Sequence, residues 1–402
     1  MPQYKYLGRD QSGRNKNGKL FSTSKREATL KLKQKGIRVE EIQEIPETLL
    51  NKELSFGSRI KMHDFVIYLR QFATLLKAGV TVVDSTRILA NQTQSKTLQR
   101  ALVSIEEDLR NGNPLSEATL KHKNLFPIMF INMVRAGEIA GNLDETLDRL
   151  ATYFEKQHRT RQKIKGALAY PAVITVVAIA VVIFLLVAVV PTFVDMFKDF
   201  GAQLPAITVF VLNSSEFMQK FWWLIVLVIL LFVGLLFVLY KDAKTRYYLD
   251  LILLKMPVFG SIVQKAAIAR MTRTLGSLFS SSVPILRALT IVETIVGNEI
   301  LARVLKQSRD SLEEGLPLTM PMENHWAIPP LVSHMIAIGE QTGSLDAMLT
   351  KVADFYESEV EIATDRLKSL IEPIMILVLA SVVGTIVISI MVPMFDIYNH
   401  VQ

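Results

Sequence analysis

The amino-acid sequence predicts an all-α membrane protein with two homologous cytoplasmic six-helix bundles, three transmembrane helices and a small N-terminal α+β unit. Three observations predict this fold. Three long stretches lack any charged residue, the charge-rich blocks before two of them repeat one another, and the first 45 residues follow a different pattern. At 402 residues, the chain is long enough for two or three domains of ordinary size.

The first element is a predicted α+β unit at residues 1–50. Strand-like sequence lies on both sides of a Gly- and Asn-rich turn. A helix then opens with Ser24-x-x-Glu27 and ends at Gly36, and residues 37–45 alternate like a strand. The early positive charges are not followed by the apolar stretch of a secretory signal, so this unit is expected to stay in the cytoplasm.

Positive charge is concentrated in this unit. The chain carries a net charge of +7, and residues 1–38 hold eleven Lys and Arg against two acidic residues. A basic domain of this kind is either a solvated surface or a contact for an acidic protein, anionic lipid or nucleic acid. The lysines that we single out as candidates for a partner contact are Lys31, Lys33 and Lys35.

Three stretches without Asp, Glu, Lys or Arg predict three transmembrane helices. Each has the roughly 20 apolar residues that cross about 30 Å of hydrocarbon. A buried helix of a soluble protein would show a polar face, and these stretches show almost none. The charge-free stretches are Gly166–Val194, Phe221–Tyr240 and Pro373–Phe395, and they place the transmembrane helices at residues 167–194, 221–240 and 371–395.

The distribution of Lys and Arg predicts the direction of the spans. Five Lys and Arg lie at residues 156–165 before the first span and four at residues 241–255 after the second, whereas residues 195–220 between them hold only two. Because positive charge favours the cytoplasmic side, the N-terminus is predicted inside and the C-terminus outside. The remaining segments are cytoplasmic helical domains at 58–165 and 241–369, an extracytoplasmic loop at 195–220 and an extracytoplasmic tail at 396–402.

The two charge-rich blocks repeat one another at an offset of 202 or 203 residues. Gly112-Asn113-Pro114-Leu115-Ser116 corresponds to Gly315-Leu316-Pro317-Leu318-Thr319, and residues 137–144 correspond to residues 339–346. The prolines near both ends of the following span also recur. The repeat unit is therefore a helical domain together with the span after it.

Recurring residues have predictable roles at helix ends. Gly112 and Gly315 suit the left-handed turn after a helix, and Ser116 and Thr319 are expected to cap the next helix. Asn142 is expected to cap the helix that follows the second repeated motif, with an acidic residue in its first turn.

Four recurring acids are the candidate functional residues: Glu138 and Glu340 in a Gly-Glu-x-x-Gly turn, and Asp144 and Asp346 after it. One hypothesis is a partner contact, or a hard-cation site that these glutamates share with Asp144 or Asp346, since carboxylate oxygens suit such ions. The alternative is that the glutamates cap backbone amides at the turn, and we favour this alternative.

Motifs that would indicate an enzyme are missing. Gly13–Lys19 spells GxxxxGK, but Leu20 stands where a phosphate loop needs Ser or Thr for magnesium. The chain has no cysteine, and its six histidines are scattered, so no thiolate or histidine metal site is predicted. The three charge-free stretches carry no Asp, Glu, Lys, Arg or His. We expect no catalytic activity, cofactor or metal, and a transporter or channel component is the alternative function.

The doubled pattern resembles the type II secretion F domain. The resemblance rests on Gly-Glu-x-x-Gly-Asn/Ser-Leu-Asp, an aromatic pair followed by Glu, and a proline at the entry to a span. Two such domains with three spans look like the GspF/PilC platform proteins of type II secretion systems and type IV pili, over roughly residues 1–398. Further matching segments are Arg70–Val80, Met133–Glu138 and Lys163–Pro171. The second copy departs at Ser281-Ser282-Val283, where the first has Ala78-Gly79-Val80.

The resemblance implies a non-enzymatic membrane protein of the inner (plasma) membrane that forms homo-oligomers. Its implied partners are a cytoplasmic hexameric assembly ATPase, pilins or pseudopilins, and other inner-membrane assembly proteins, with no direct nucleic-acid contact. The filament is an adhesive pilus, a secretion pseudopilus or, as the alternative, a competence pseudopilus for DNA uptake. On this hypothesis the bundles bind the ATPase, and the basic N-terminal unit contributes charge complementarity.

Overall fold

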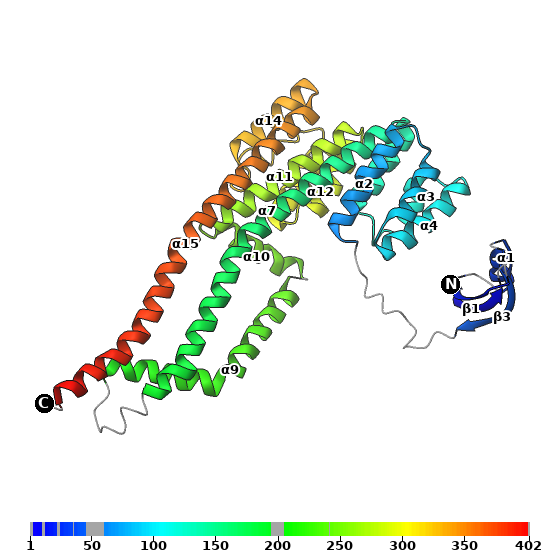
Figure 1. Cartoon of the computed structure of the whole chain (residues 1–402). Coiled ribbons are helices and arrows are strands. Elements are labelled where there is room, and N and C mark those ends of the chain that lie inside the picture. Colours follow the sequence, from blue (N-terminus) through cyan, green and yellow to red (C-terminus); the bar gives the residue numbers. More distant parts are fainter. Residues whose placement is uncertain are drawn as a thin grey trace. The chain divides into compact units, whose positions relative to one another are not determined.

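The computed structural model describes residues 3–9, 13–21, 25–34, 36–45, 60–193, 205–240 and 242–400. The chain divides into two units, Met1–Arg59 and Ile60–Gln402. The first contains a small sheet, and the second contains the long helices of Figure 1. The predicted fold class is confirmed: the chain is mostly helical, with two repeated helical blocks and three long apolar helices among the described residues.

The first unit is an antiparallel sheet with one helix. Its strands have the order β2-β1-β3. Alternation along the first strand puts Tyr4 on the inner face, where it packs with Leu32 of the helix and Ile42 of the third strand. The elements are β1 (Gln3–Arg9), β2 (Asn15–Phe21), α1 (Lys25–Gln34) and β3 (Arg38–Ile45).

The first helical block packs around an aromatic core. Phe65 contacts Phe126, Phe130 and Phe154 edge to face, and all four side chains are buried. Such contacts add to the burial of large apolar area. The six helices of residues 60–193 are α2 (Met62–Lys77), α3 (Val82–Gln92), α4 (Lys96–Arg110), α5 (Leu115–Leu120), α6 (Ile128–Ala140) and α7 (Leu143–Phe184).

The second block also has six helices in residues 242–400, but it reaches that number differently. Residues 318–324 form turns where the first block has α5. Pro321 lies there, and proline inside a helix lacks a donor and clashes with the preceding turn. An added helix begins the block instead. The helices are α10 (Ala243–Lys255), α11 (Phe259–Ser280), α12 (Ile285–Ile295), α13 (Glu299–Glu313), α14 (Pro330–Thr342) and α15 (Leu345–His400).

Turn geometry is repeated between the blocks. Gly112 and Gly315 have φ angles of 85° and 80°, as their sequence predicted. Gly79 follows α2 with a φ of 83°, and Ser282 takes the same left-handed conformation after α11 with a φ of 58°. A residue with a Cβ is strained there, whereas glycine is not. The departure of the second copy from Ala-Gly-Val therefore leaves the turn intact at a cost in backbone strain.

Two of the apolar spans are parts of longer helices. α7 continues through a π-helical turn, η1 (Leu185–Val189), to give one helix over Leu143–Phe193, and α15 is 56 residues long. The predicted limits between domain and span at residues 165–167 and 369–371 thus fall inside unbroken helices. Among the described residues, three helices are long and apolar enough to cross a membrane, and the pair α10 and α11, bent by 114°, also meets the length and composition test.

The remaining span, α9 (Ala206–Leu239), begins well before the predicted start at Phe221. Helical structure therefore covers residues 206–220 of the segment predicted as a loop. This first part of α9 lies against the two other spans: Thr208 Oγ1 donates to the Ser389 carbonyl at 2.7 Å, and Ser215 Oγ donates to the Leu186 carbonyl. Both side chains are buried, and buried hydroxyls need partners within the protein, which these have.

The two helical blocks share one hydrophobic core. Buried residues from Phe65 to Tyr356 form a single cluster that includes side chains of both blocks. α7, α11 and α15 meet at the boundary, where the Tyr153 hydroxyl lies 2.9 Å from Thr274 Oγ1 in a buried hydrogen bond. The duplicated domains are therefore packed against one another.

Candidate functional site

The recurring Gly-Glu-x-x-Gly sequence forms a tight corner between two helices in each block. Gly137 lies where α6 meets α7, and a Cβ there would come within 2.6 Å of Thr146 Oγ1. A Cβ on Gly339 would lie 3.0 Å from the first Cα of α15. Gly141 and Gly343 end α6 and α14 with φ angles of 73° and 68°, which favour glycine. Close packing and chain reversal therefore explain the four glycines.

Glu138 and Glu340 each bind a backbone amide 22 residues earlier in the chain. The Ser116 N–H lies 3.3 Å from both carboxylate oxygens of Glu138, and the Leu318 N–H donates to Glu340 Oε1 at 2.9 Å. Both carboxylates are half-buried. They satisfy amides at the start of α5 and of the matching turn, which is the alternative favoured by the sequence. A partner contact at these glutamates stays a prediction.

Three predicted helix caps are wrong. Thr319 lies in the turns of residues 318–324, where no helix begins. Asn142 precedes α7, but its side chain accepts no backbone amide and lies 3.4 Å from the Thr146 hydroxyl. Ser116 lies inside α5, which begins at Leu115, so its hydroxyl does not cap that helix. The amide of Ser116 is satisfied by Glu138, which is distant in the sequence.

The other candidate residues take simpler positions. Asp144 and Asp346 lie in the first turns of α7 and α15, where a carboxylate favours the helix dipole. Lys33 is an exposed residue of α1, the side chain of Lys31 lies outside the described part of the chain, and so does the whole of Lys35. Within the described residues, no three His, Asp or Glu side chains converge in a way that could hold a metal ion.

A bidentate ion pair joins the first helix of the first block to its last helix. Arg70 of α2 donates from Nε and Nη2 to the two carboxylate oxygens of Glu155 on α7, at 2.6 Å each. The same guanidinium donates to Asp148 at 2.6 Å and to the Thr152 hydroxyl at 3.1 Å. Paired N–H donors on a carboxylate fix both distance and orientation. This contact therefore sets how α2 packs on α7.

The second block repeats this ion pair with one difference. Arg273 of α11 donates to the two oxygens of Glu357 on α15 at 2.8 Å and 2.9 Å, and it also binds Asp354. The acid and the threonine beside the glutamate have exchanged places. The first block has Asp148 and Thr152, and the second has Thr350 and Asp354 at the corresponding positions, one helical turn apart.

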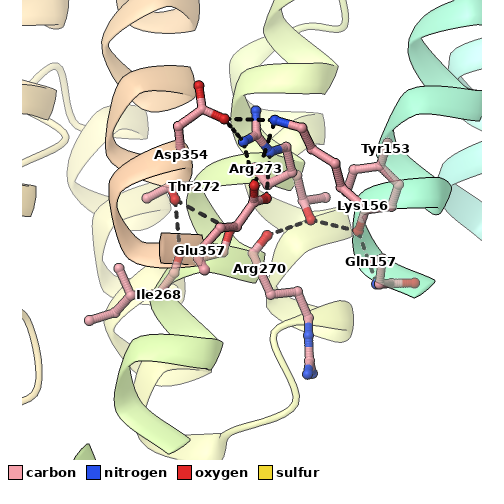
Figure 2. A network of polar contacts seen from close by, with 11 residues as sticks. Tyr153, Lys156, Gln157, Ile268, Arg270, Thr272, Arg273, Asp354 and Glu357 are labelled. Carbon is pink, nitrogen blue, oxygen red and sulfur yellow. Dashed lines mark hydrogen bonds and ion pairs between the residues drawn. The ribbon is translucent and has the colours of Figure 1, made fainter. Parts of the chain in front are cut away.

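The exchange places an acid where the other repeat can reach it. Lys156 of α7 donates to Asp354 at 2.7 Å and lies 3.6 Å from Glu357, so an ion-pair network links the two blocks (Figure 2). Lys163 forms a second pair with Glu361 further along the same two helices. We call the residues Lys156, Lys163, Arg273, Asp354, Glu357 and Glu361 the inter-repeat network.

Electrostatics within this network keeps Asp354 ionised. Burial by itself would raise the pKa of Asp354, but hydrogen bonds and charge from Lys156 and Arg273 outweigh it and hold the pKa below its usual value. Next to the network, burial raises the pKa of the Tyr153 hydroxyl, which stays protonated and bonded to Thr274. The arrangement suits a fixed mechanical link, because its charged groups are matched and its hydroxyl is neutral.

Sequence reasoning missed the inter-repeat network. Glu155 and Glu357 belong to the recurring motif of two aromatic residues followed by Glu, and Arg70 lies in a segment that matches the family. Arg70 and Arg273 also recur at the offset of the repeat, which is a usable signal. The pairing itself spans more than 80 residues, so only the packing of α2 on α7 and of α11 on α15 reveals it.

Comparison with protein-family models gives matches over most of the chain. The family described as Type II secretion system (T2SS), protein F matches residues 68–191 and again 271–393. The N-terminal domain of type II secretion system protein F matches residues 1–43. The double match agrees with the repeated blocks, and each matched region ends in an apolar span.

Full-length relatives carry names from two machines. The chain is 38% identical over 405 residues to type IV pilus assembly protein PilC of Thermus thermophilus, covering 99% of this chain and 98% of that protein. It is 35% identical over 405 residues to type II secretion system protein F of Xanthomonas campestris, covering both chains completely. The chain therefore belongs to the family of type II secretion system protein F and the type IV pilus protein PilC, whose members are non-enzymatic platform proteins.

Proposed function

We propose that this multi-pass protein is the inner-membrane platform through which a cytoplasmic hexameric ATPase drives pilins or pseudopilins into a growing filament. Both repeated blocks then lie in the cytoplasm, with the N-terminus, and the C-terminus lies outside. The names of the full-length relatives support a role in pilus assembly or type II secretion. The positive residues that flank the spans support the orientation.

One observation carries the coupling role. The last helix of each block continues unbroken into a membrane span, so α7 and α15 belong at once to a bundle and to the membrane. The inter-repeat network and the shared core join the two blocks. A force applied to either bundle is therefore passed to the spans without a loop between them.

The basic first unit supports an acidic partner surface. Eleven Lys and Arg lie in residues 1–38, and described members such as Lys33 and Arg38 are exposed. Complementary charge increases the rate and specificity of protein association more than its final affinity. The ATPase is therefore expected to bind faster at low salt than at high salt.

The orientation is tested by labelling single cysteines, which is clean because the chain has none of its own. Asn111→Cys, Asn324→Cys and Asn213→Cys place one thiol at an exposed asparagine in each block and on α9. In intact spheroplasts, a membrane-impermeant maleimide should label only the cysteine at 213. Labelling of the cysteine at 111 or 324 from outside refutes the orientation and with it the ATPase contact.

The coupling is tested in cells that lack this chain. Filament number, counted by electron microscopy, should fall to zero and return with the wild-type gene, while the assembly ATPase stays expressed. Lys33→Glu should reduce co-purification of the ATPase at low salt, and Lys220→Glu, on the predicted outer side, serves as the control with the same charge change. If co-purification of the ATPase depends neither on salt nor on Lys33→Glu, the proposed charge complementarity is refuted. If the number of filaments is unchanged in cells without the chain, the proposed function is refuted.

A further inference from the structure

A small cavity lies beside the inter-repeat network, between α7, α11 and α15. Its volume is about 60 Å³, and its polar wall includes Arg161 and Thr160 of α7 and Arg270 of α11. Glu357 also lines it, but both oxygens of that carboxylate are held by Arg273. A buried water needs about 10–15 Å³ of such volume, so the cavity has room for the four oxygens of a phosphoryl group.

Two of the three arginines that line this cavity have no acidic partner in the described part of the chain. Among the described residues, no carboxylate lies within ion-pair distance of Arg161 or Arg270. Arg270 donates from one nitrogen to the Val296 carbonyl at 3.2 Å, and Figure 2 shows its guanidinium pointing away from Asp354 and Glu357. Burial first, and then the nearby positive charge of Arg161, lower the pKa of Arg270.

The charges around the cavity leave an unmatched positive excess. Lys156 and Arg273 are balanced by Asp354 and Glu357. The guanidiniums of Arg161 and Arg270 remain. Like charges this close are unfavourable unless an anion joins them, and the half-burial of Arg270 adds to this cost. Arginine binds phosphate oxygens well because its planar donors match them. An anion with several oxygens is therefore the ligand that this wall favours.

The position along α7 identifies the source of the anion. Arg161 lies five residues before the charge-free stretch that begins at Gly166, which is about 7.5 Å along a helix. The polar headgroup layer of one leaflet is about 5–7 Å thick. Ile164, one turn nearer the span, gives the cavity an apolar wall on that side. The backbone of Arg161 therefore lies at the outer edge of this layer, from which its long side chain can reach lipid phosphates, and Arg270 lines the same cavity.

We propose that the cavity between α7, α11 and α15 binds the phosphate headgroup of an anionic phospholipid through Arg161 and Arg270. The bound lipid neutralises the junction of the two repeats and holds it at the membrane surface. Basic pockets between helices at this depth are suited to such headgroups. This inference is independent of the proposed role in filament assembly, because it concerns binding by the isolated chain.

The test uses the full-length chain in detergent, with phosphatidylglycerol binding measured by native mass spectrometry against phosphatidylcholine. Arg161→Gln and Arg270→Gln should each weaken phosphatidylglycerol binding about tenfold, the effect of losing one charge-assisted hydrogen bond. Arg159→Gln removes an exposed charge of α7 that does not line the cavity, and it should change binding less than about twofold. Arg270→Lys keeps the charge but loses the planar donors, so it should weaken binding less than Arg270→Gln does.

Each other outcome overturns the proposal. Equal binding of the two lipids by the wild-type chain, or equal losses in Arg159→Gln and Arg161→Gln, would show a diffuse charge effect. Displacement of the lipid by millimolar inorganic phosphate would show a site for free anions. Arg161 is exposed, so Arg161→Gln keeps the test decisive if Arg270→Gln fails to fold, as judged by helical circular dichroism.

Discussion

Replacing Arg273 by Gln is expected to destabilise the protein more than the same change at Arg70. Both arginines make a bidentate pair with a glutamate of the last helix in their block. Their surroundings differ: the side chains of Arg273 and Glu357 are 12% and 20% exposed, whereas those of Arg70 and Glu155 are 39% and 38% exposed.

The exposure of each ion pair determines how much stability is lost when its arginine is replaced. Removing one partner from a buried ion pair costs about 3–5 kcal/mol, because a charge stays buried without compensation. Exposed pairs contribute about 0.2–1 kcal/mol, because water screens them. Arg273 is nearly buried and Gln keeps some hydrogen bonding, so we expect a loss of about 2–3 kcal/mol for Arg273→Gln and about 1 kcal/mol for Arg70→Gln.

The assay is thermal unfolding of the detergent-purified chain, followed by circular dichroism at the helical band. At about 2 °C per kcal/mol for a domain of this size, Arg273→Gln should lower the midpoint by about 4–6 °C and Arg70→Gln by about 2 °C. Arg110→Gln breaks an exposed pair within α4 and should change it by about 1 °C or less. Equal losses at Arg70 and Arg273 would refute the reasoning from burial.

Three further predictions use the same assay. Glu340→Ala removes the acceptor of the Leu318 amide and should cost about 1 kcal/mol; an unchanged midpoint would contradict the capping role. Gly79→Ser puts a side chain at a positive φ and should cost about 1–2 kcal/mol, whereas Ser282→Gly should raise the midpoint slightly, and the opposite signs would disprove the strain at this turn. The third prediction concerns pH, because the pKa of Asp354 is lower in the folded protein than its ordinary value of 3.8. The contribution of Asp354 to the free energy of unfolding is complete above pH 3.8 and is lost as the pH falls through the lower folded pKa. The unfolding midpoint should therefore drop in this acid range, and Asp354→Asn should make that drop smaller.

Features that depend on local pattern were predictable from the sequence. The three spans follow from the absence of charge, and the two blocks follow from repeated turns such as Gly112 and Gly315. The local chemistry of single residues was less reliable. Asn142 is a residue type that often caps helices and lies just before α7, yet its side chain accepts no backbone amide of that helix. Glu138 instead binds an amide at the start of a helix that begins more than 20 residues earlier. Tertiary packing decided both cases.

Features that depend on long-range pairing could not be predicted in this way. Asp148 and Thr152 in one copy, and Thr350 and Asp354 in the other, read as two mismatches in the repeat. They become meaningful only when α7 and α15 lie together, because Lys156 then has an acid within reach. A single sequence shows where repeats differ, but the physical reason for a difference lies in the contact between the copies.

The continuity of α15 has a mechanical consequence. A helix of 56 residues is about 84 Å long, and a rotation of about 5° around its bundle end would sweep the other end through about 7 Å. The helix has no break that would absorb such a rotation, so α15 can act as a lever arm that pivots at its bundle end. Small changes of angle at one side of the bilayer would then become displacements of more than one helical turn at the other.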